Sequence, residues 1–424
     1  EGGGGDDRLD GGAGRNTLSG GSGQDTLLRG VDSLKLQRFG SMTELRRYLN
    51  GLTDRRRPVP MPMFRGGGIA DTSGPVMAPS APGGNLTIGG GGAERDHSNT
   101  NVQVEGVDEA DIIETDGEFL YILSRQDLAI VDARAPESLA LSSKTSVEGW
   151  PIAEYLRGDK LTVLSSVFIE SPNPGPASRS SRMASTLLPW FGGESKVKIT
   201  EYDVSNRAHP QVTRETYLDG YYVDSRVVGD QTYVIVQNDV MTRLAVGMAR
   251  SGAPTTAFDS AAQIRRRIDT ATADQLVPTF EVKTPGGARQ SGPISAPGEI
   301  LRPIGGDDGN LISVVSLNAD RGIVGSTTVV SSYASTIYAS ADRLYLLTPR
   351  YGESQASTTI HALSLNNGQV APLASGEVPG TVLDQFSVDE HNGYLRVATT
   401  VSRWGDGRGN TTNNLYVLGL QGDS

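Results

Sequence analysis

From about Asn99 to its end, the chain repeats one pattern of polar and apolar positions. A polar turn leads into a strand dense in Leu, Val, Ile and Tyr, and a second apolar strand follows. The five pairs are TDGEFLYILS with LAIVDA, RGDKLTVLSS with VKITEYDVS, VGDQTYVIVQ with LISVVSLN, SADRLYLLT with TIHALSLN, and EHNGYLRVATT with NLYVLGL. Apolar runs of this length are typical of strands that are buried on both faces. We expect the strand residues that pack between neighbouring sheets to include Leu120, Ile122, Val163, Val234, Val236, Leu344, Leu346 and Val397.

Each pair starts at a tight turn, and more polar strands lie between the pairs. The turns are predicted at Asp116–Gly117, Gly158–Asp159, Gly229–Asp230, Ala341–Asp342 and Asn392–Gly393. Gly, Asn and Asp favour such turns because two-residue hairpins need a positive φ. Four antiparallel strands whose burial decreases outward form a propeller blade. We therefore expect an all-β fold, a β-propeller of four-stranded antiparallel blades with about four and a half blades present.

The predicted propeller domain covers residues 99–424 and contains two insertions, near residues 171–193 and 238–308. The last strand pair stops where the outer strand of its blade should follow. We therefore expect the propeller to be truncated at its C-terminal end, with apolar blade faces and strand edges left uncovered.

The sequence before the propeller divides into three segments. Residues 1–30 are a Gly/Asp array, residues 31–53 contain a short helix, and residues 54–98 are a Pro/Gly/Ser-rich segment that we interpret as a flexible linker. Within RFGSMTELRRYLN, Ser41 can cap the helix and Glu44 completes the S-x-x-E capping box.

A second helix is predicted inside the second propeller insertion. In AFDSAAQIRRRIDT the apolar side chains recur at helical spacing and share one face. The run Arg265–Arg267 then lies on the solvated face of this helix. We interpret it as surface charge and not as a patch for nucleic acid.

Composition limits the remaining possibilities. The chain has 424 residues, with 38 Lys plus Arg against 49 Asp plus Glu, and its net charge is −11. An acidic chain is a poor ligand for a phosphate backbone, so we expect no nucleic-acid partner. No cysteine is present, which excludes disulfides and thiolate metal sites. No apolar run reaches the roughly 20 residues that span a bilayer. Because the sequence starts inside a repeat pattern, we expect a fragment or a processed form.

The stretch GVDEADIIETDG, residues 106–117, contains the string DEAD at Asp108–Asp111. In nucleic-acid-dependent ATPases this string works together with a loop G-x-x-x-x-G-K-[ST] that cradles phosphates. The sequence has no such loop, so we exclude the ATPase interpretation. The string instead lies at the start of the first blade.

Three long motifs identify a family resemblance. NTNVQVEGVDEADIIETDG, LDGYYVDSRVVGDQTYVIV and VPGTVLDQFSVDEHNGYLRVATT resemble the secreted β-propeller-domain proteins of bacteria and archaea that are distantly related to WD40 repeats. The likeness extends from Leu34 to the end. It implies a propeller fold and an extracellular, cell-surface or periplasmic location, without an assigned reaction. In that family a basic residue is favoured where this chain has Glu114.

Asp108, Glu109 and Asp111 admit two interpretations. Clustered carboxylates attract hard cations and could form a cation or ligand site at the rim of the propeller. Alternatively, they accept hydrogen bonds from backbone N–H groups and fix the link to the last blade. We favour the second interpretation, because alternation along a strand separates Asp108 from the other two.

No catalytic residue is predicted. The histidines lie far apart in the sequence, without a metal-binding spacing; they are His97, His209, His361 and His391. The sequence also lacks the nucleophile motif G-x-S-x-G.

The Gly/Asp array divides into three nonapeptides, GGGGDDRLD, GGAGRNTLS and GGSGQDTLL. Each fits G-G-x-G-x-[DN]-x-L-x and closely resembles the RTX, or hemolysin-type, calcium-binding repeat. In a roll of this type the same side returns after 18 residues, as from Asp7 to Asp25. The resemblance implies calcium as a cofactor, with six to eight oxygen ligands. The predicted side-chain ligands are Asp7, Asp25 and Asn16, and the predicted backbone-carbonyl ligands are Gly3, Gly5, Gly21 and Gly23.

Two functions from different classes follow. The first is a non-catalytic interaction or scaffold module outside the cell, whose ligand is a protein or a polysaccharide and whose repeats bind calcium. The alternative is a secreted hydrolase or lyase with its active site at the mouth of the propeller. Propellers host both functions, so the fold alone does not decide between them. The oligomeric state also stays open.

Overall fold

The structure is a computed structural model of the 424-residue chain. It describes residues 3–4, 8–10, 21–22, 26–28, 36–55, 103–170, 193–240, 261–303, 309–331, 336–351, 355–403 and 410–420. The segment 54–98, predicted as a linker, lies almost entirely outside these residues.

The described strands of the propeller region form five successive sheets, which we number blades 1 to 5. Blade 1 contains β7 (Ile113–Thr115), β8 (Phe119–Ser124), β9 (Asp127–Asp132) and β10 (Ala140–Ser146). Blade 2 contains β11 (Trp150–Arg157), β12 (Lys160–Glu170), β13 (Gly193–Asp203) and β14 (Gln211–Asp219). Blade 3 contains β15 (Tyr221–Val228), β16 (Gln231–Asp239), β20 (Asn310–Asn318) and β21 (Gly322–Ser331). Blade 4 contains β22 (Thr336–Ala339), β23 (Arg343–Tyr351), β24 (Ala356–Asn366) and β25 (Gln369–Pro379). Blade 5 contains β26 (Val388–His391), β27 (Tyr394–Arg403) and β28 (Asn410–Gly419).

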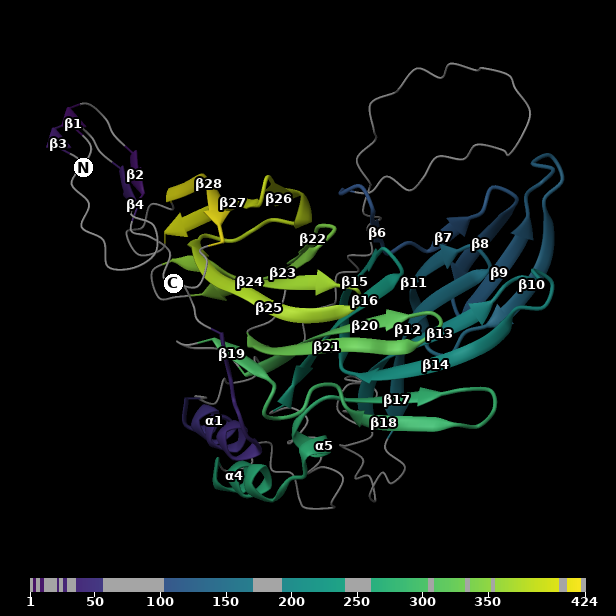
Figure 1. The fold of residues 1–424 in the computed structure, drawn as a ribbon, viewed down its shortest axis with the longest axis horizontal. Coiled ribbons are helices and arrows are strands. Elements are labelled where there is room, and N and C mark those ends of the chain that lie inside the picture. Colours follow the sequence, from purple (N-terminus) through teal and green to yellow (C-terminus); the bar gives the residue numbers. More distant parts are fainter. Residues whose placement is uncertain are drawn as a thin grey trace, which may run out of the picture.

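Within each blade, strands that follow one another in the sequence are hydrogen-bonded antiparallel neighbours. Figure 1 shows the blades as a fan that runs from blade 1 at the upper right to blade 5 at the upper left. The predicted all-β propeller is confirmed, with four blades of at least four strands and one of three described strands.

The predicted hairpin turns lie between the first and second strands of the blades. Gly117 adopts a φ of +86°, and Asn392 and Gly393 adopt +52° and +79°, so these turns use the left-handed region as expected. The turn at Ala341–Asp342 also has two residues in its loop, because the N–H of Ser340 donates to the carbonyl of Arg343. It differs in that it forms without a left-handed residue.

The blades pack through alternating residues of their central strands. On β16, Val234 and Val236 pack against blade 2, whereas Tyr233 and Ile235 pack against blade 4. Both faces of the strand are therefore buried, which explains its continuous apolar run. The residues predicted to pack between blades are confirmed as buried at six positions, namely Val163, Val234, Val236, Leu344, Leu346 and Val397.

Leu120 and Ile122 were also predicted to be buried between blades, and this was wrong, because both side chains are only half-buried. On β8 it is Tyr121 and Leu123 that pack toward blade 2. Leu120 points to the other face of blade 1, where Leu141 is 61% exposed. No described sheet covers this face.

Blade 5 also has an uncovered face. Leu395 and Val397 of β27 pack against blade 4, whereas Leu415 and Val417 of β28 are each 59% exposed. Leu415 pairs with Ala398, next to Val397, so it lies on the face away from blade 4. The two end blades of the fan therefore each present an apolar face to solvent.

Three further additions extend the inner blades. The hairpin β17 (Thr279–Lys283) and β18 (Arg289–Pro293) comes from the second insertion and adds to the outer edge of blade 2. Strands β19 (Leu301–Pro303) and β5 (Leu36–Arg38) add to the outer edge of blade 3, and β6 (Val107–Glu109) adds to its inner edge. The sequence pattern did not indicate these additions, because their partners are distant in the chain.

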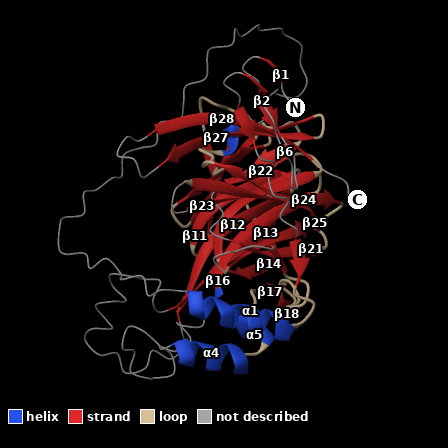
Figure 2. Cartoon of the chain, turned by 90° about the vertical axis from the view of Figure 1, so that its left-hand side faces the viewer, coloured by secondary structure: helices blue, strands red, loops and turns tan. Residues whose placement is uncertain are grey.

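The helices form a small layer beside blade 3. They are α1 (Met42–Arg55), α4 (Ala261–Thr270) and α5 (Ala273–Leu276). Leu45 of α1 and Ile268 of α4 share a core with Leu311 and Val330 of blade 3. Figure 2 shows this layer gathered at one end of the molecule, beside the strands of the blades. Both predicted helices are present, and the N–H of Glu44 donates to the Ser41 hydroxyl at 3.2 Å as expected for the cap.

The two ends of the propeller are distinguishable. At the end that we call the mouth face, the innermost strand of each blade begins; at the other, the turn face, it turns into the second strand. Ion pairs join neighbouring blades at the turn face. They are Arg207 with Asp116 (2.9 Å, blades 2 and 1), Arg157 with Asp230 (3.2 Å, blades 2 and 3) and Arg343 with Glu390 (blades 4 and 5).

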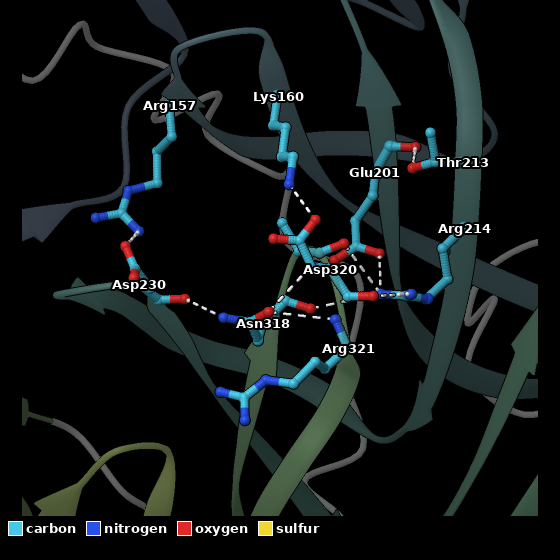
Figure 3. A network of polar contacts seen from close by, with 10 residues as sticks. Arg157, Lys160, Glu201, Thr213, Arg214, Asp230, Asn318, Asp320 and Arg321 are labelled. Carbon is cyan, nitrogen blue, oxygen red and sulfur yellow. Dashed lines mark hydrogen bonds and ion pairs between the residues drawn. The ribbon is translucent and has the colours of Figure 1, made fainter.

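The junction of blades 2 and 3 at the turn face is a wider network (Figure 3). Lys160 pairs with Asp320 in the turn between β20 and β21. Arg214 donates to Glu201 at 2.9 Å and to the backbone carbonyl of Asp320 at 2.9 Å. Burial raises the pKa of Glu201 to about 7, and the ion pair with Arg214 opposes this shift without cancelling it. The Arg214 guanidinium therefore holds a nearly buried carboxyl and a turn of the next blade at once.

Candidate functional site

Residues 103–115, which we call the inner segment, run along the innermost strands of the propeller. Gln103 Nε2 donates to the carbonyl of Gln385 at 3.0 Å, at the start of blade 5. Strand β6 then pairs with β15 of blade 3. Next, the carbonyl of Asp111 accepts from the N–H of Glu154 in blade 2 at 2.7 Å. The segment ends as β7 of blade 1, so the stretch that carries the DEAD string joins four blades.

Glu109 is the carboxylate of this segment with a clear structural partner. Gln385 Nε2 donates to Glu109 Oε2 at 3.0 Å, and Arg226 Nη2 donates to Gln385 Oε1. Arg226 also pairs with Asp224 at 2.5 Å, so the chain of contacts joins blade 3 to the start of blade 5. For Glu109 this geometry agrees with the predicted link to the last blade, but the donor is a side-chain amide and not the predicted backbone N–H.

Four other carboxylates, Asp108, Asp111, Glu114 and Glu154, influence one another electrostatically, and we call them the inner carboxylates. Burial raises the pKa of Glu154 to about 9, the charge of Glu114 adds to the shift, and the nearby backbone N–H of Glu114 opposes it. Burial also raises the pKa of Glu114 to about 8, with contributions from Asp108 and Asp111.

Backbone N–H groups near Asp108, Glu114 and Glu154 lower the pKa values of these carboxyls, but less than burial raises them. Glu154 is fully buried, and neither of its carboxyl oxygens has a hydrogen-bond partner within the described part of the chain. Oε1 of Glu114 is likewise buried and without a partner there. The alternation expected to separate Asp108 from Asp111 stops at Glu109, where β6 ends.

The chemistry open to this cluster is proton storage or contact with a positively charged group. A carboxyl with a pKa of about 8 or 9 is mostly protonated at neutral pH and then donates a hydrogen bond. Among the residues that the structure describes, no three His, Cys, Asp or Glu side chains are placed to hold a metal ion.

Large apolar side chains are exposed at the mouth face. The innermost strands of blades 1, 2 and 3 begin at Ile113, Trp150 and Tyr221, which are 53%, 68% and 53% exposed. In blade 5, Phe386 lies just before β26 and is 71% exposed. We call these four the mouth residues. Further exposed apolar residues at the mouth-face ends of strands or in the adjoining connections are Ile112, Phe168, Ile169, Tyr351 and Leu383.

The loop that presents Phe386 is held in place. Asp384 caps the short helix η2 (Gln385–Ser387) by accepting from the N–H of Ser387. The Gln385 side chain contacts Glu109 and Arg226, as described above. An exposed aromatic side chain on an ordered loop loses little further conformational freedom on binding, which is the property of a preorganised contact residue.

The turn face has fewer such side chains in equivalent positions and more interblade ion pairs. Tyr394, the first residue of β27, lies there and is 53% exposed, the same fraction as Tyr221. It therefore serves as a matched reference for Tyr221.

The predicted calcium segment is described in part. Strands β1 (Gly3–Gly4) and β3 (Gly21–Ser22) pair in parallel, with Gly3 opposite Gly21. Strands β2 (Arg8–Asp10) and β4 (Thr26–Leu28) also pair in parallel, with Leu9 opposite Leu27. Both registers are offset by 18 residues, as expected for a roll of nonapeptides. The predicted ligands Asp7, Asn16, Asp25, Gly5 and Gly23 lie outside the described residues, so the ligand set stays a prediction.

The described histidines are not gathered in one place. His209 and His391 are exposed. His361 is fully buried, and burial lowers its pKa to about 4. Its Nδ1 lies 2.6 Å from the Ser375 hydroxyl, which indicates a neutral imidazole satisfied within blade 4.

Sequence reasoning missed Glu154 and the pair Arg226–Gln385. Glu154 is the single charged residue inside the apolar part of the strand WPIAEYLR, and this exception was a usable signal. Gln385 has no distinguishing local pattern, and only the fold places it beside Glu109.

Comparisons with known proteins identify both parts of the chain. Residues 97–424 match the family model of the Beta propeller domain. Residues 1–32 match the model of the RTX calcium-binding nonapeptide repeat (4 copies). No helix in the described part of the chain has the length and apolar character to cross a membrane.

Two curated relatives are archaeal. The uncharacterized protein MJ1554 of Methanocaldococcus jannaschii is 26% identical over 366 residues, which are 76% of this chain and 52% of the relative. An uncharacterized protein of Archaeoglobus fulgidus is 37% identical over 84 residues, which are 18% of this chain and 12% of that protein. The chain thus spans about half the length of the first relative and a smaller part of the second.

Among solved structures, a chain of the S. cerevisiae Dbp5 complex with Nup159 and Gle1 aligns at 5% identity with a TM-score of 0.30, covering 74% of this chain and 66% of that one. A functionally unknown protein from Desulfotomaculum acetoxidans aligns at 8% identity with a TM-score of 0.19, covering 72% and 100%. Such scores support no inference. The propeller model, by contrast, covers most of the sequence, and the chain belongs to the Beta propeller domain family, with RTX calcium-binding nonapeptide repeats at its N-terminal side.

Proposed function

We propose that this protein is a secreted or cell-surface propeller that acts as a non-catalytic interaction module, with calcium bound by its N-terminal repeats. The observation that supports the proposal is the gathering of exposed apolar side chains at one face. Four of the five blades contribute a mouth residue, which is Ile113, Trp150, Tyr221 or Phe386.

The physical reason is the cost of exposing such side chains. Large apolar groups that face water in a group, and not singly, mark surfaces that a partner covers. Trp and Tyr are also enriched at the centres of protein interfaces, where they add large contact area with few rotatable bonds. The location outside the cell is proposed from the RTX repeats, and the partner is proposed to be a protein or a polysaccharide of that environment.

The test compares two tyrosines of equal exposure. Cell-envelope fractions of the source organism are passed over the immobilised chain, and binding is measured by biolayer interferometry. We expect Tyr221→Ala, combined with Trp150→Ala, to reduce binding at least tenfold, whereas Tyr394→Ala keeps it. Protease or periodate treatment of the fractions then separates protein from polysaccharide ligands. Equal binding by the mouth variants and by Tyr394→Ala would contradict the proposal.

A further inference from the structure

Two mouth residues, Ile113 and Trp150, lie in the same stretches of chain as the inner carboxylates Asp111 and Glu154. Asp111 comes two residues before Ile113, and it is bridged to Glu154, which lies four residues after Trp150 on β11. The apolar positions at the mouth face therefore lie next to a part of the propeller axis that carries several carboxylates.

The charge there is not balanced by cations. Arg226 is engaged by Asp224 and Gln385. Of the inner carboxylates, Asp108 alone is influenced by a nearby cation, Arg157, which is already paired with Asp230. Within the described residues, no side chain donates a hydrogen bond to Asp111, which is half-buried and so in contact with solvent.

Glu154 adds a second observation at this place, independent of the apolar side chains. A fully buried carboxyl with both oxygens unpartnered is rare, because leaving buried polar atoms unsatisfied is costly. Burial is the main cause of the raised pKa of Glu154, and the charges of Glu114 and Asp111 add to it, so these carboxyls lie near Glu154. Because Glu114 and Glu154 are mostly protonated at neutral pH, Asp111 is the carboxylate that a positively charged group would contact.

We propose that the mouth face binds a polypeptide segment in which a Lys or Arg is flanked by apolar side chains. The apolar side chains contact the mouth residues, and the cationic side chain pairs with the half-buried carboxylate of Asp111. This inference rests on the proposed function and names the chemical class of its ligand. Two features favour a peptide over a neutral polysaccharide. A polysaccharide offers sugar rings that stack on aromatic side chains, but the mouth residues also include the aliphatic Ile113. A neutral polysaccharide also has no cation to pair with a carboxylate.

The test uses an array of synthetic decapeptides in which Lys, Arg, Glu, Ser, Leu and Phe are varied systematically. The full-length chain is applied in calcium-containing buffer, and selected peptides are titrated in solution by fluorescence anisotropy. We expect binding to require a Lys or Arg next to Leu or Phe, with a loss of at least tenfold when the cation is replaced by Ser.

Variants assign the two contacts separately. Asp111→Asn is expected to remove the preference for Lys and Arg while residual binding to apolar peptides remains. Tyr221→Ala is expected to weaken binding to all peptides. Glu118→Gln, an exposed carboxylate at the turn face, and Tyr394→Ala serve as controls and are expected to bind like the unmodified chain.

Three outcomes would overturn the inference. They are no sequence-dependent binding on the array, an unchanged cation preference in Asp111→Asn, and binding to a polysaccharide or to lipid vesicles in place of peptides. If the envelope fractions bind in a Tyr221-dependent manner and no peptide on the array binds, the proposed interaction module is supported and the proposed peptide ligand is contradicted. If neither binds, both proposals fail together.

Discussion

The N–H of Glu154 donates to the carbonyl of Asp111 at 2.7 Å, and this contact joins the inner segment to blade 2. It places a fully buried carboxyl beside the stretch that already carries Asp108, Asp111 and Glu114. The same contact thus helps to assemble the blades and concentrates negative charge near the mouth face. This combination of a structural bond and an electrostatic cost makes the inner segment the most informative place for substitutions.

The first prediction concerns Glu154. Its pKa is about 9 in the folded chain and 4.5 as a reference value, so the folded state keeps a proton that the unfolded state has lost. The protonated carboxyl contributes fully to the free energy of unfolding below about pH 4.5. This contribution decreases as the pH rises toward 9, by up to about 1.4 kcal/mol per pH unit. Glu154→Gln removes this loss, so we expect it to stabilise the chain at pH 8 and to change little at pH 5.

Urea denaturation of both proteins at pH 5, 7 and 9 measures the effect. Glu118→Gln, which changes an exposed carboxylate, is the control and should follow the unmodified chain. Parallel pH profiles for Glu154→Gln and the unmodified chain would show that the carboxyl is satisfied in solution.

The second prediction concerns the network of Figure 3. Arg214→Met leaves the nearly buried Glu201 without its cation and removes the contacts to the next turn of blade 3. Breaking one side of a buried pair costs about 3 kcal/mol. We therefore expect a loss of this size in the free energy of unfolding at pH 8. Because burial already raises the pKa of Glu201 to about 7, the loss should shrink at pH 5, where the carboxyl becomes protonated.

The comparison is Arg321→Met, which replaces an exposed arginine in the neighbouring turn and should cost little. Both variants are followed by thermal and urea unfolding. Equal stability of the two variants at pH 8 would show that Arg214 does not hold blades 2 and 3 together.

The third prediction concerns calcium. Parallel strand pairs with an 18-residue offset join the first and third nonapeptides, which contain the predicted ligands Asp7 and Asp25. We expect isothermal titration of the whole chain with calcium to show binding that Asp25→Ala abolishes. Asp10→Ala, at the ninth position of its nonapeptide, should leave binding intact. Absence of heat at millimolar calcium would argue that these repeats alone form no site.

The fourth prediction concerns the two end blades. Leu141 on blade 1 and Val417 on blade 5 are 61% and 59% exposed on faces that no described sheet covers. Apolar patches of this kind bind hydrophobic dyes and promote association. We expect the 424-residue chain to bind such a dye, and Leu141→Lys with Val417→Lys to reduce both dye fluorescence and self-association in sedimentation experiments. A monodisperse chain without dye binding would show that the faces are covered in solution.

The sequence by itself determined the blades. The centre of a strand such as β16 is apolar at consecutive positions, from Tyr233 to Val236, because neighbours bury both of its faces, and that local pattern is visible without any structure. It also determined the two helices and the nonapeptide repeats, because caps, helical spacing and a nine-residue period are properties of short segments.

Only the tertiary structure decided which face of an end blade is covered and which distant groups meet. Leu120 and Ile122 follow the same strand pattern as Val234 and Val236, yet no described neighbour lies on their side of blade 1. Glu154 and Asp111 are 43 positions apart and Gln385 is farther still, so no local pattern could join them. They meet because the inner segment follows the propeller axis instead of staying in one blade, and such a path depends on how the blades pack, not on the residues that lie along it.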